Sequence, residues 1–522
     1  MLAWLETRRV FVMVLALGLF AMAARGMTDP DAWWHLRTGE LITTSHSVPH
    51  SDPYSYTRFG QPWVAHEWLS DVVIYRLYRA GGWGGLIVVF AGITTATLLL
   101  VFVRCAGRPY VAGTMTVWAA VASIPCWGVR PLMLSLLLAS IFLIILERSN
   151  TRPNGLWWIP PLMLLWVNLH GEYALGIALL ALFLVGGVLD AALGVEPWAQ
   201  TRPRLGKLAM VIALSVALVP FNPNGARMYS YPFQTLHSRA MQHYIAEWAS
   251  PNFHQGRFLP ALLMMLATLA GLGLAPRRVR PRDMLLLLVM TAAALRSVRH
   301  LPIYVLVAAP ILSGLAQSFV EGHGRAWLDL TRTRALPGKA VVNASLLAVV
   351  AILAGARVSH VVRHQGESEA ENFPKAAVAF LAEQQPPGPI LNHYNWGGYF
   401  IWKLYPRYRV YIDGRADLYG DAFMDQFAAT YYLTSGWREE LERWQIRTVI
   451  LPPAAPLVTA LRAEPAWKQV YADSQAAVLT RNQGKEYPEP GKVSVEVQCL
   501  QQLRGAPVSD GSISEAGNPR RF

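Results

Sequence analysis

Residues 28–40, "TDPDAWWHLRTGE", come directly after an apolar run at 9–26 that is long enough to cross a bilayer. Two carboxylates, Asp29 and Asp31, therefore stand at the end of a first membrane helix, together with His35 and a pair of tryptophans. A structural account of this motif is a capped helix at the membrane surface, with Pro30 in its first position, Asp29 as N-cap and Asp31 in the first turn. The alternative is that one of the two carboxylates takes part in a reaction. The rest of the sequence helps to decide between these two interpretations.

The composition is that of an integral membrane protein. Of the 522 residues, 53% are hydrophobic and only 15% are charged, and the mean hydropathy is +0.28. A helix needs roughly 17–25 apolar residues to cross about 30 Å of hydrocarbon. This length predicts about eleven spans, at 9–26, 84–103, 111–128, 132–147, 156–170, 173–193, 208–221, 258–275, 284–295, 301–318 and 340–356.

The distribution of basic residues predicts the orientation, because short cytoplasmic loops retain Lys and Arg. With the N-terminus inside, every inside loop contains at least two basic residues, and one of these loops is the cluster "APRRVRPRD" at 275–283. The short outside turns contain only Arg130, Arg296 and Arg299. The net charge of +13 then follows from topology, and we do not expect a nucleic-acid partner. The three cysteines indicate neither a disulfide framework nor a metal cluster.

This topology predicts three regions. Residues 1–356 form the membrane module, with outer loops at 28–82 and 222–257, and residues 357–482 form a small extracytoplasmic α/β domain. Residues 483–522 lack periodicity and are expected to be disordered. In the first outer loop a second surface helix is expected at about 64–80. In the α/β domain we expect strands at "PILNHY", "YRVYIDG", "RTVILPP" and "AAVLTRN", and helices near 373–385, 421–433, 437–445 and 455–463.

Several ionisable residues on the predicted outer face have a structural and a functional interpretation. His170 and Glu172 in "NLHGEY" lie at a helix end near membrane depth, where such groups are functional or paired, or belong to a helix cap. Glu247, with His243 nearby, is either a second acidic group or metal ligand, or a solvated loop residue. His66 and Glu67 do not form a zinc motif, because Ser70 occupies the place of the second histidine.

The stretches "DPDAWWHLRTGE", "WVAHEWL", "NLHGEYALG", "EWASPNF", "NWGGYFIW" and "VYIDGRADLYG" carry a family resemblance. With the acidic motif after the first span, the large outer loop and the C-terminal outer domain, the chain resembles the GT-C superfamily of membrane glycosyltransferases to about residue 481. Members include protein O-mannosyltransferases, aminoarabinose transferases and oligosaccharyltransferases. Asp-Pro-Asp differs both from the Asp-Glu of the mannosyltransferases and from a regular Asp-X-Asp metal motif. The identity of the base and the need for a metal therefore stay open.

The resemblance implies a polytopic helical enzyme of the bacterial inner membrane that moves a sugar from a polyprenyl-phosphate donor to an acceptor hydroxyl on the extracytoplasmic face. Asp29 or Asp31 would be the catalytic base. The turn "RSVRH" would bind the donor phosphate through Arg296, Arg299 and His300, or would only anchor two spans at the headgroups. No cofactor is definite, and a divalent cation is an open alternative.

Further residues are candidates for supporting the site or contacting the acceptor, which would be a glycan, lipid or protein. Trp396 lies in "NWGGYFIW", which distantly resembles the segment by which oligosaccharyltransferases read the acceptor peptide, although Gly397 stands in the place of the acid. Asp413 and Arg415 would line an acceptor groove, or belong to a plain turn. The full candidate set is His35, His66, Glu67, His170, Glu172, His243, Glu247, Trp396, Asp413 and Arg415.

Two other classes of function fit the same architecture. One is a transporter, although that would place paired charges at mid-membrane on broken helices. The other is a non-catalytic membrane partner in envelope polysaccharide assembly. The sequence specifies neither the sugar nor the acceptor, neither the metal dependence nor the oligomeric state.

Overall fold

The structure is a computed structural model of the whole chain, and it describes residues 6–275, 278–322 and 338–482. These residues form two compact units. The first unit contains the residues up to Asp52, Gly60–Ser238 and Glu247–Asn372. The second contains Pro53–Phe59, Arg239–Ala246 and the residues from Phe373 on.

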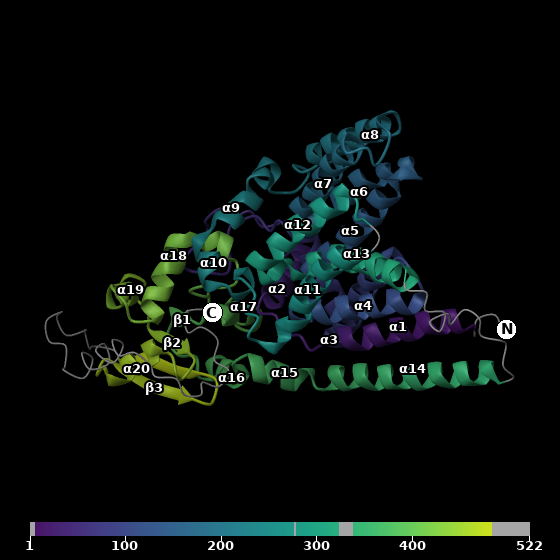
Figure 1. Cartoon of the computed structure of the whole chain (residues 1–522). Helices are drawn as coiled ribbons and strands as arrows, with labels where there is room; N and C mark the ends of the chain where they lie inside the picture. Colours follow the sequence, from purple (N-terminus) through teal and green to yellow (C-terminus); the bar gives the residue numbers. More distant parts are fainter. Residues whose placement is uncertain (1–5, 276–277, 323–337, 483–522) are drawn as a thin grey trace, which may run out of the picture. The chain divides into compact units, whose positions relative to one another are not determined.

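The first unit is a bundle of helices (Figure 1). Apolar segments favour helices because a helix satisfies its backbone hydrogen bonds within the segment. In chain order the helices are α1 (Thr7–Ala23), α2 (Ala32–Ser45), α3 (Trp68–Arg104), α4 (Pro109–Ser123), α5 (Leu132–Glu147), α6 (Ile159–Leu169), α7 (Tyr173–Ala192), α8 (Trp198–Ala217), α9 (Tyr231–His237), α11 (Leu259–Leu274), α12 (Pro281–Arg296), α13 (Leu301–Gly322), α14 (Lys339–Arg363) and α15 (Gln365–Asn372).

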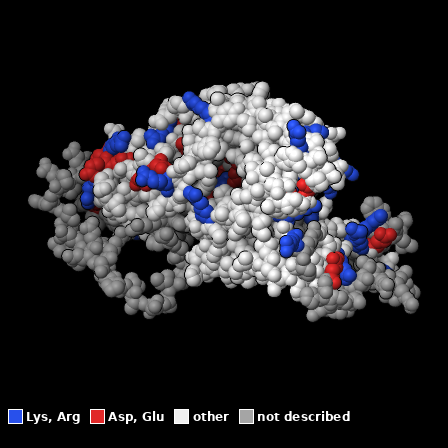
Figure 2. All heavy atoms as spheres, turned by 45° about the horizontal axis from the view of Figure 1, so that its top comes forward, with Lys and Arg blue, Asp and Glu red and all other residues white. Residues whose placement is uncertain are grey.

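In the described part of the chain, six helical segments are long and apolar enough to cross a membrane. They are Trp68–Arg104, Leu132–Asn150, Tyr173–Ala192, Gly256–Leu274, Val298–Glu321 and Lys339–Arg363. Each overlaps a predicted span, and the other predicted spans overlap the remaining helices α1, α4, α6, α8 and α12. The multi-pass helical architecture is therefore confirmed, while the count of eleven spans and the orientation stay predictions. Residues other than Lys, Arg, Asp and Glu cover most of the face in Figure 2, and acidic and basic side chains are visible in a hollow near its middle.

The first outer loop differs in detail from the prediction. Helix α2 begins at Ala32 rather than at Pro30, and Asp31 is its N-cap residue. Asp29 is therefore not the N-cap, because its Oδ1 accepts the backbone N–H of Asp31 at 2.9 Å and closes the turn before the helix. The predicted second surface helix begins at Trp68, later than expected, and a kink at Gly82 (φ 57°) separates it from the span that follows. Glycine adopts this left-handed conformation without the strain that a Cβ would cause.

The link between α1 and α2 is held by a helix from far along the chain. The amide oxygen of Gln365, the first residue of α15, accepts the backbone N–H of Met27 at 2.8 Å. The Gln365 amide N–H donates back to the Met27 carbonyl at 3.3 Å. Both residues are buried, so this reciprocal pair fixes the backbone two residues before Asp29.

The second unit contains a four-stranded mixed sheet in the order β1-β2-β4-β3. Strands β1 (Ile390–Asn392) and β2 (Thr448–Leu451) are parallel, whereas β4 (Ala477–Arg481) is antiparallel to both β2 and β3 (Trp467–Ala472). An apolar core that includes Phe427, Leu441, Val449 and Leu461 lies among the sheet and its helices. The helices are α10 (Arg239–Tyr244), α16 (Lys375–Gln384), α17 (Gly397–Leu404), α18 (Ala416–Tyr431), α19 (Trp437–Arg443) and α20 (Pro456–Ala463).

The predicted strand "YRVYIDG" is wrong. Within it only Val410 makes a strand contact, an isolated bridge with Ser55. The side chain of Asn392 takes the neighbouring backbone groups, accepting from Tyr411 N at 2.8 Å and donating to the Ile412 carbonyl at 2.7 Å. Because these groups are already satisfied, they do not pair in a ladder. The predicted disordered tail at 483–522 lies outside the described residues.

Candidate functional site

Six turns and loops of the first unit bring their ionisable side chains together. They are far apart in the sequence, but each lies next to the end of a helix in the bundle. We call the resulting group the charged cluster, and its members are Asp29, Asp31, His35, His66, Glu67, Asp71, Arg130, His170, Glu172, Glu247 and Arg299.

The two aspartates of the Asp-Pro-Asp motif have different partners. Asp29 Oδ2 lies 3.1 Å from Nε of Arg130, so this carboxylate is paired with a cation. Asp31 Oδ1 accepts the indole N–H of Trp34 at 3.1 Å. Burial, and then the negative charge of Asp29, raise the pKa of Asp31 to about 7, while His35 and Arg130 act in the opposite direction. Asp31 can therefore gain and lose a proton near neutral pH.

Glu247 bridges two arginines. Its Oε2 lies 2.9 Å from Nη2 of Arg130, and its Oε1 lies 2.7 Å from Nη1 of Arg299. Burial opposes ionisation of Glu247, but the two guanidinium groups prevail and lower its pKa to about 2. Arg299 also binds Glu172, with 2.5 Å between Nε and Oε1. The result is a continuous chain of ion pairs from Asp29 to Glu172, in which carboxylates and guanidinium groups alternate.

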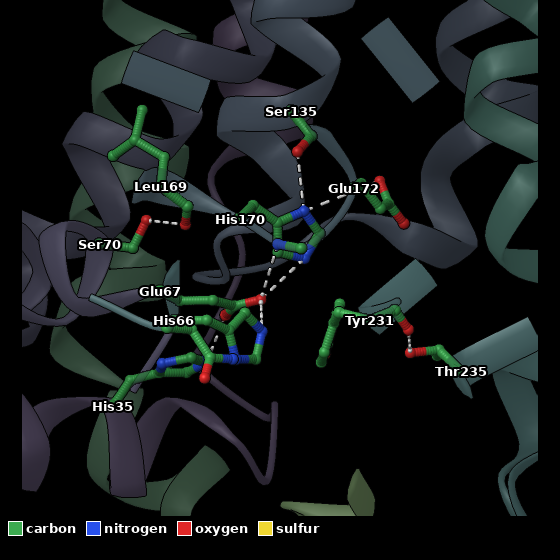
Figure 3. Close-up of polar contacts among 12 residues, drawn as sticks. His35, His66, Glu67, Ser70, Ser135, Leu169, His170, Glu172, Tyr231 and Thr235 are labelled. Atoms are coloured by element: carbon green, nitrogen blue, oxygen red, sulfur yellow. Dashed lines mark hydrogen bonds and ion pairs between the residues drawn. The ribbon is translucent and has the colours of Figure 1, made fainter. Parts of the chain in front are cut away.

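His170 continues this chain towards Glu67 (Figure 3). Its Nε2 lies 3.2 Å from Nη2 of Arg299 and 3.5 Å from Oε1 of Glu67, and its Nδ1 lies 2.7 Å from the hydroxyl oxygen of Ser135. The indole N–H of Trp166 donates to the same hydroxyl at 2.8 Å, which fixes Ser135. The imidazole ring is thus held in place from both sides.

Beyond Glu67 the chain ends in a buried histidine–aspartate pair. His35 Nε2 lies 3.7 Å from Oε2 of Glu67, and its Nδ1 lies 2.6 Å from Oδ1 of Asp71. Burial lowers the pKa of His35, but the hydrogen bond and charge of Asp71, with the charge of Glu67, outweigh burial and raise it. These neighbours therefore favour the protonated form of His35.

Gly171 allows the turn between α6 and α7 to approach Glu67. Its backbone N–H donates to Oε1 of Glu67 at 3.2 Å. A Cβ at this position would lie 2.6 Å from the ring of Tyr231 and 3.3 Å from Nε2 of His66. The Tyr231 and His66 rings themselves are in contact, with 4.3 Å between their centroids. A side chain at position 171 would therefore force these rings apart.

Several predicted site residues lie outside the charged cluster. Arg296, at the end of α12, is exposed, and His300 lies near the Trp248 ring, 6.3 Å between centroids. The other four, His243, Trp396, Asp413 and Arg415, belong to the second unit.

In the second unit, Asp413 and Arg415 form a buried ion pair. Arg415 Nη2 lies 2.7 Å from Oδ2 of Asp413, and the Tyr419 hydroxyl donates to the same oxygen at 2.7 Å. Trp396 is buried beside His393, with 5.2 Å between ring centroids. These contacts support the interior of that unit.

Sequence reasoning missed two members of the cluster. Arg130 was noted only as one of three basic residues in the short outside turns, and that rarity was the available signal. Asp71 follows Glu67 by four residues, the spacing that places two side chains on one face of a helix. Among the described residues, no group of three or more His, Cys, Asp or Glu is arranged to hold a metal ion. A divalent cation accordingly stays an open prediction.

No model of a known protein family and no curated protein sequence matches the chain. Solved structures resemble it at low identity. The apo oligosaccharyltransferase of Archaeoglobus fulgidus has a TM-score of 0.51 at 12% identity, covering 93% of this chain and 76% of that one. The oligosaccharyltransferase AglB from the same organism, in complex with an inhibitory peptide and a dolichol-phosphate, has a TM-score of 0.50 at 12% identity, covering 92% and 75%.

A third similar structure is ArnT from Cupriavidus metallidurans bound to undecaprenyl phosphate, with a TM-score of 0.46, 16% identity and coverage of 92% of this chain and 99% of that one. The chain shares the fold of the GT-C membrane glycosyltransferases, as its sequence motifs predicted. At these identities the likeness concerns the fold, and the activity has to be argued from the charged cluster.

Proposed function

We propose that the chain is a membrane glycosyltransferase that moves a sugar from a polyprenyl-phosphate-linked donor to an acceptor hydroxyl on the extracytoplasmic face of the bacterial inner membrane. The observation that carries this proposal is Asp31, a carboxyl group with a pKa of about 7, beside a network of partly buried arginines. The fold supports the same class of reaction, and one structure of that fold contains a dolichol-phosphate.

Asp31 is the proposed base. In the transfer, the acceptor oxygen forms a bond to the anomeric carbon of the sugar, while the bond from that carbon to the phosphate oxygen breaks. The hydroxyl proton passes to Asp31, and the electron pair of the broken bond stays on the lipid phosphate. A base works best when its pKa lies near the working pH, because it is then both available and able to hold the proton. Asp29 positions this base through the backbone N–H of Asp31 and through Arg130.

Arg130 and Arg299 are the proposed cations for the departing phosphate. Guanidinium groups bind phosphate oxygens in pairs and stabilise charge that develops as the bond breaks. Glu247 now lies between these arginines, which marks the position as one where an anion is stable. We propose that the donor phosphate replaces the Glu247 carboxylate, while Asp29 and Glu172 keep the two arginines in place. A divalent cation would stabilise the same phosphate charge. Whether the reaction needs such a cation is tested by adding a chelator.

The alternative functions predict different chemistry for the same cluster. A transporter or a non-catalytic partner would bind a lipid phosphate, but it would not cleave the bond between sugar and phosphate. The ionisable groups join the ends of helices instead of breaks within them, which favours an enzyme at the membrane surface over a transporter. The acceptor would be a hydroxyl of a glycan, a lipid or a protein.

The test uses the purified full chain in liposomes with synthetic undecaprenyl-phosphate-linked hexose, pentose and aminopentose. Release of undecaprenyl phosphate, measured by mass spectrometry with and without a chelator, reports cleavage of the sugar–phosphate bond. We expect release from at least one donor and a strong loss in Asp31→Asn. Arg462→Gln, an exposed change in the second unit, is the matched control and should keep full activity. Binding of undecaprenyl phosphate without cleavage of any donor would favour the non-catalytic alternatives.

A further inference from the structure

A second polar feature of the first unit lies away from the charged cluster. It is a cavity of about 200 Å³ lined by the ends of α3 and α5, the start of α12 and the middle of α13. Arg282, near the start of α12, lines this cavity, whereas the end of α12 leads into the turn that contains Arg299. Helix α12 has 16 residues, a length of about 24 Å at 1.5 Å per residue. The cavity and the charged cluster therefore lie at opposite ends of the bundle.

The wall of the cavity is apolar. It is formed by aliphatic side chains of membrane helices, including Leu143, Leu286, Val307, Ile311 and Leu315. On the same helix α12, Leu288 and Val289 are exposed, at 61% and 39% of their surface. Apolar surface therefore continues from the cavity region along this helix, as expected where a hydrocarbon chain contacts it.

The rim of the cavity is basic. Arg104, Arg278, Arg280 and Arg282 line it, against the two carboxylates Glu147 and Asp283. The lining therefore has two more cationic than anionic side chains. These residues come from the loop "APRRVRPRD" and from the ends of two spans, the region in which the sequence predicts the cytoplasmic side.

The four arginines of this rim fall into two pairs that differ in their exposure and in their carboxylate partners. Arg104 is buried and bound to Glu147, with 2.7 Å between Nη2 and Oε1. Arg282 binds Asp283 at 3.0 Å. Arg280 binds Glu196 at 2.9 Å, but 42% of its side chain is exposed, and Arg278 is exposed as well. The first pair shapes the cavity, and the second pair is accessible to a ligand.

We propose that this cavity binds the phosphate headgroup of an anionic phospholipid, with Arg278 and Arg280 contacting the phosphate and an acyl chain lying along the apolar wall. Basic pockets between membrane helices are typical sites for such headgroups. The proposal does not depend on the activity proposed for the charged cluster.

The experiment is native mass spectrometry of the full chain in detergent, with dioleoyl phosphatidylglycerol and dioleoyl phosphatidylcholine as probes. We expect phosphatidylglycerol to be retained more strongly than phosphatidylcholine. Arg278→Gln and Arg280→Gln should each weaken that retention by roughly fivefold, the scale of one basic residue near an anionic headgroup. Arg148→Gln is the matched control, because Arg148 follows α5 at the same end of the bundle, is exposed and does not line the cavity.

A second variant tests the apolar wall without changing any charge. Gly314 lines the cavity, and Gly314→Leu should reduce retention of phosphatidylglycerol by occupying the space of the acyl chain. Equal retention of both lipids, or an equal loss in Arg148→Gln, would overturn the proposal in favour of unspecific surface attraction. Displacement of the lipid by millimolar inorganic phosphate would assign the cavity to a free anion instead.

Discussion

Two groups of ion pairs differ in burial and in origin. Asp413 with Arg415 in the second unit is fully buried, whereas Glu247 with its two arginines in the first is only partly buried. Asp413 and Arg415 are two residues apart and bind each other through both carboxylate oxygens. Glu247, Arg130 and Arg299 come from three separate loops. The local pair forms as soon as its turn forms, whereas the distributed set exists only when the bundle is complete.

This difference separates a structural ion pair from a group of charges that is suited to chemistry. The local pair is fully buried and closed by the Tyr419 hydroxyl, so it serves the interior of its own unit. The charged cluster instead contains more carboxylates than guanidinium groups, and one of them, Asp31, has a pKa displaced to about 7. Such a displacement is typical of a group that exchanges protons during function.

The largest expected effect is on catalysis. Asp31→Asn keeps the size of the side chain but removes the proton acceptor, so turnover should fall by roughly 10²–10⁴, the usual contribution of a positioned base. The unfolding temperature in detergent should stay close to that of the parent protein. Asp29→Asn, which loses the ion pair with Arg130, should reduce turnover less. Full turnover in Asp31→Asn would remove the base assignment.

The matching change in the second unit should act on stability instead. Asp413→Asn leaves the buried Arg415 without its anionic partner, which should lower the free energy of unfolding by about 3–5 kcal/mol. Thermal unfolding of the purified protein measures this loss. Asp417→Asn, at an exposed position in α18, is the control and should change stability by about 0.5 kcal/mol or less. If Asp413→Asn is as stable as the parent protein but inactive, the pair belongs to a functional site, as the acceptor-groove hypothesis predicts.

Arg299 should affect binding more than folding of the chain. Arg299→Ala removes one of the two guanidinium groups proposed for the donor phosphate, so binding of undecaprenyl phosphate should weaken by about 2–5 kcal/mol. Titration calorimetry of the purified protein measures this change. Arg296→Ala, at the exposed end of α12, provides the comparison within the same "RSVRH" stretch. If both variants bind equally well, the stretch only anchors the spans.

The pH dependence follows from the raised pKa of Asp31. The base is active when deprotonated, so kcat/KM should rise about tenfold per pH unit below pH 7 and level off above it. Stability should change in the opposite sense. The folded protein retains a proton on Asp31 that an unfolded carboxyl loses near pH 4, so this contribution to stability disappears as the pH rises from about 4 to 7. If the residual kcat/KM of Asp31→Asn still falls below pH 7 as in the parent protein, the titrating group is not Asp31.

The smallest expected effect concerns Glu247. Glu247→Gln removes the carboxylate that competes with the donor phosphate for Arg130 and Arg299, so undecaprenyl phosphate should bind more tightly, by up to about tenfold. Glu172→Gln is the comparison, because Glu172 binds Arg299 but not Arg130 and should not compete for the position between the two arginines. Weaker binding in Glu247→Gln would show that this carboxylate supports the phosphate site.

The sequence predicted most of the helical architecture, because apolar runs and helix-breaking turns are local properties. Asp29, Asp31, Glu172 and Arg299 were also identified from local motifs. Glu247 was also a candidate, but its role between two arginines could not be assigned, since its partner Arg130 lies 117 residues away and nothing near Glu247 indicates that pairing. The failed strand at "YRVYIDG" has a similar cause, because the side chain of Asn392, which is 19 and 20 residues from Tyr411 and Ile412, takes their backbone groups. In both cases the structure depends on residues that are distant in the sequence, which local patterns do not reveal.

The hydrogen-bonded pair of Met27 and Gln365 sets an order of events during biosynthesis. The two residues are separated by 338 positions, so the segment before Asp29 leaves the ribosome long before Gln365 has been translated. At about 5–20 residues per second, the interval is roughly 20–70 s. During that time the nascent chain inserts most of its helices with the Asp-Pro-Asp turn unsecured. The backbone before the Asp-Pro-Asp turn therefore gains this pair of hydrogen bonds only after α15 has been translated.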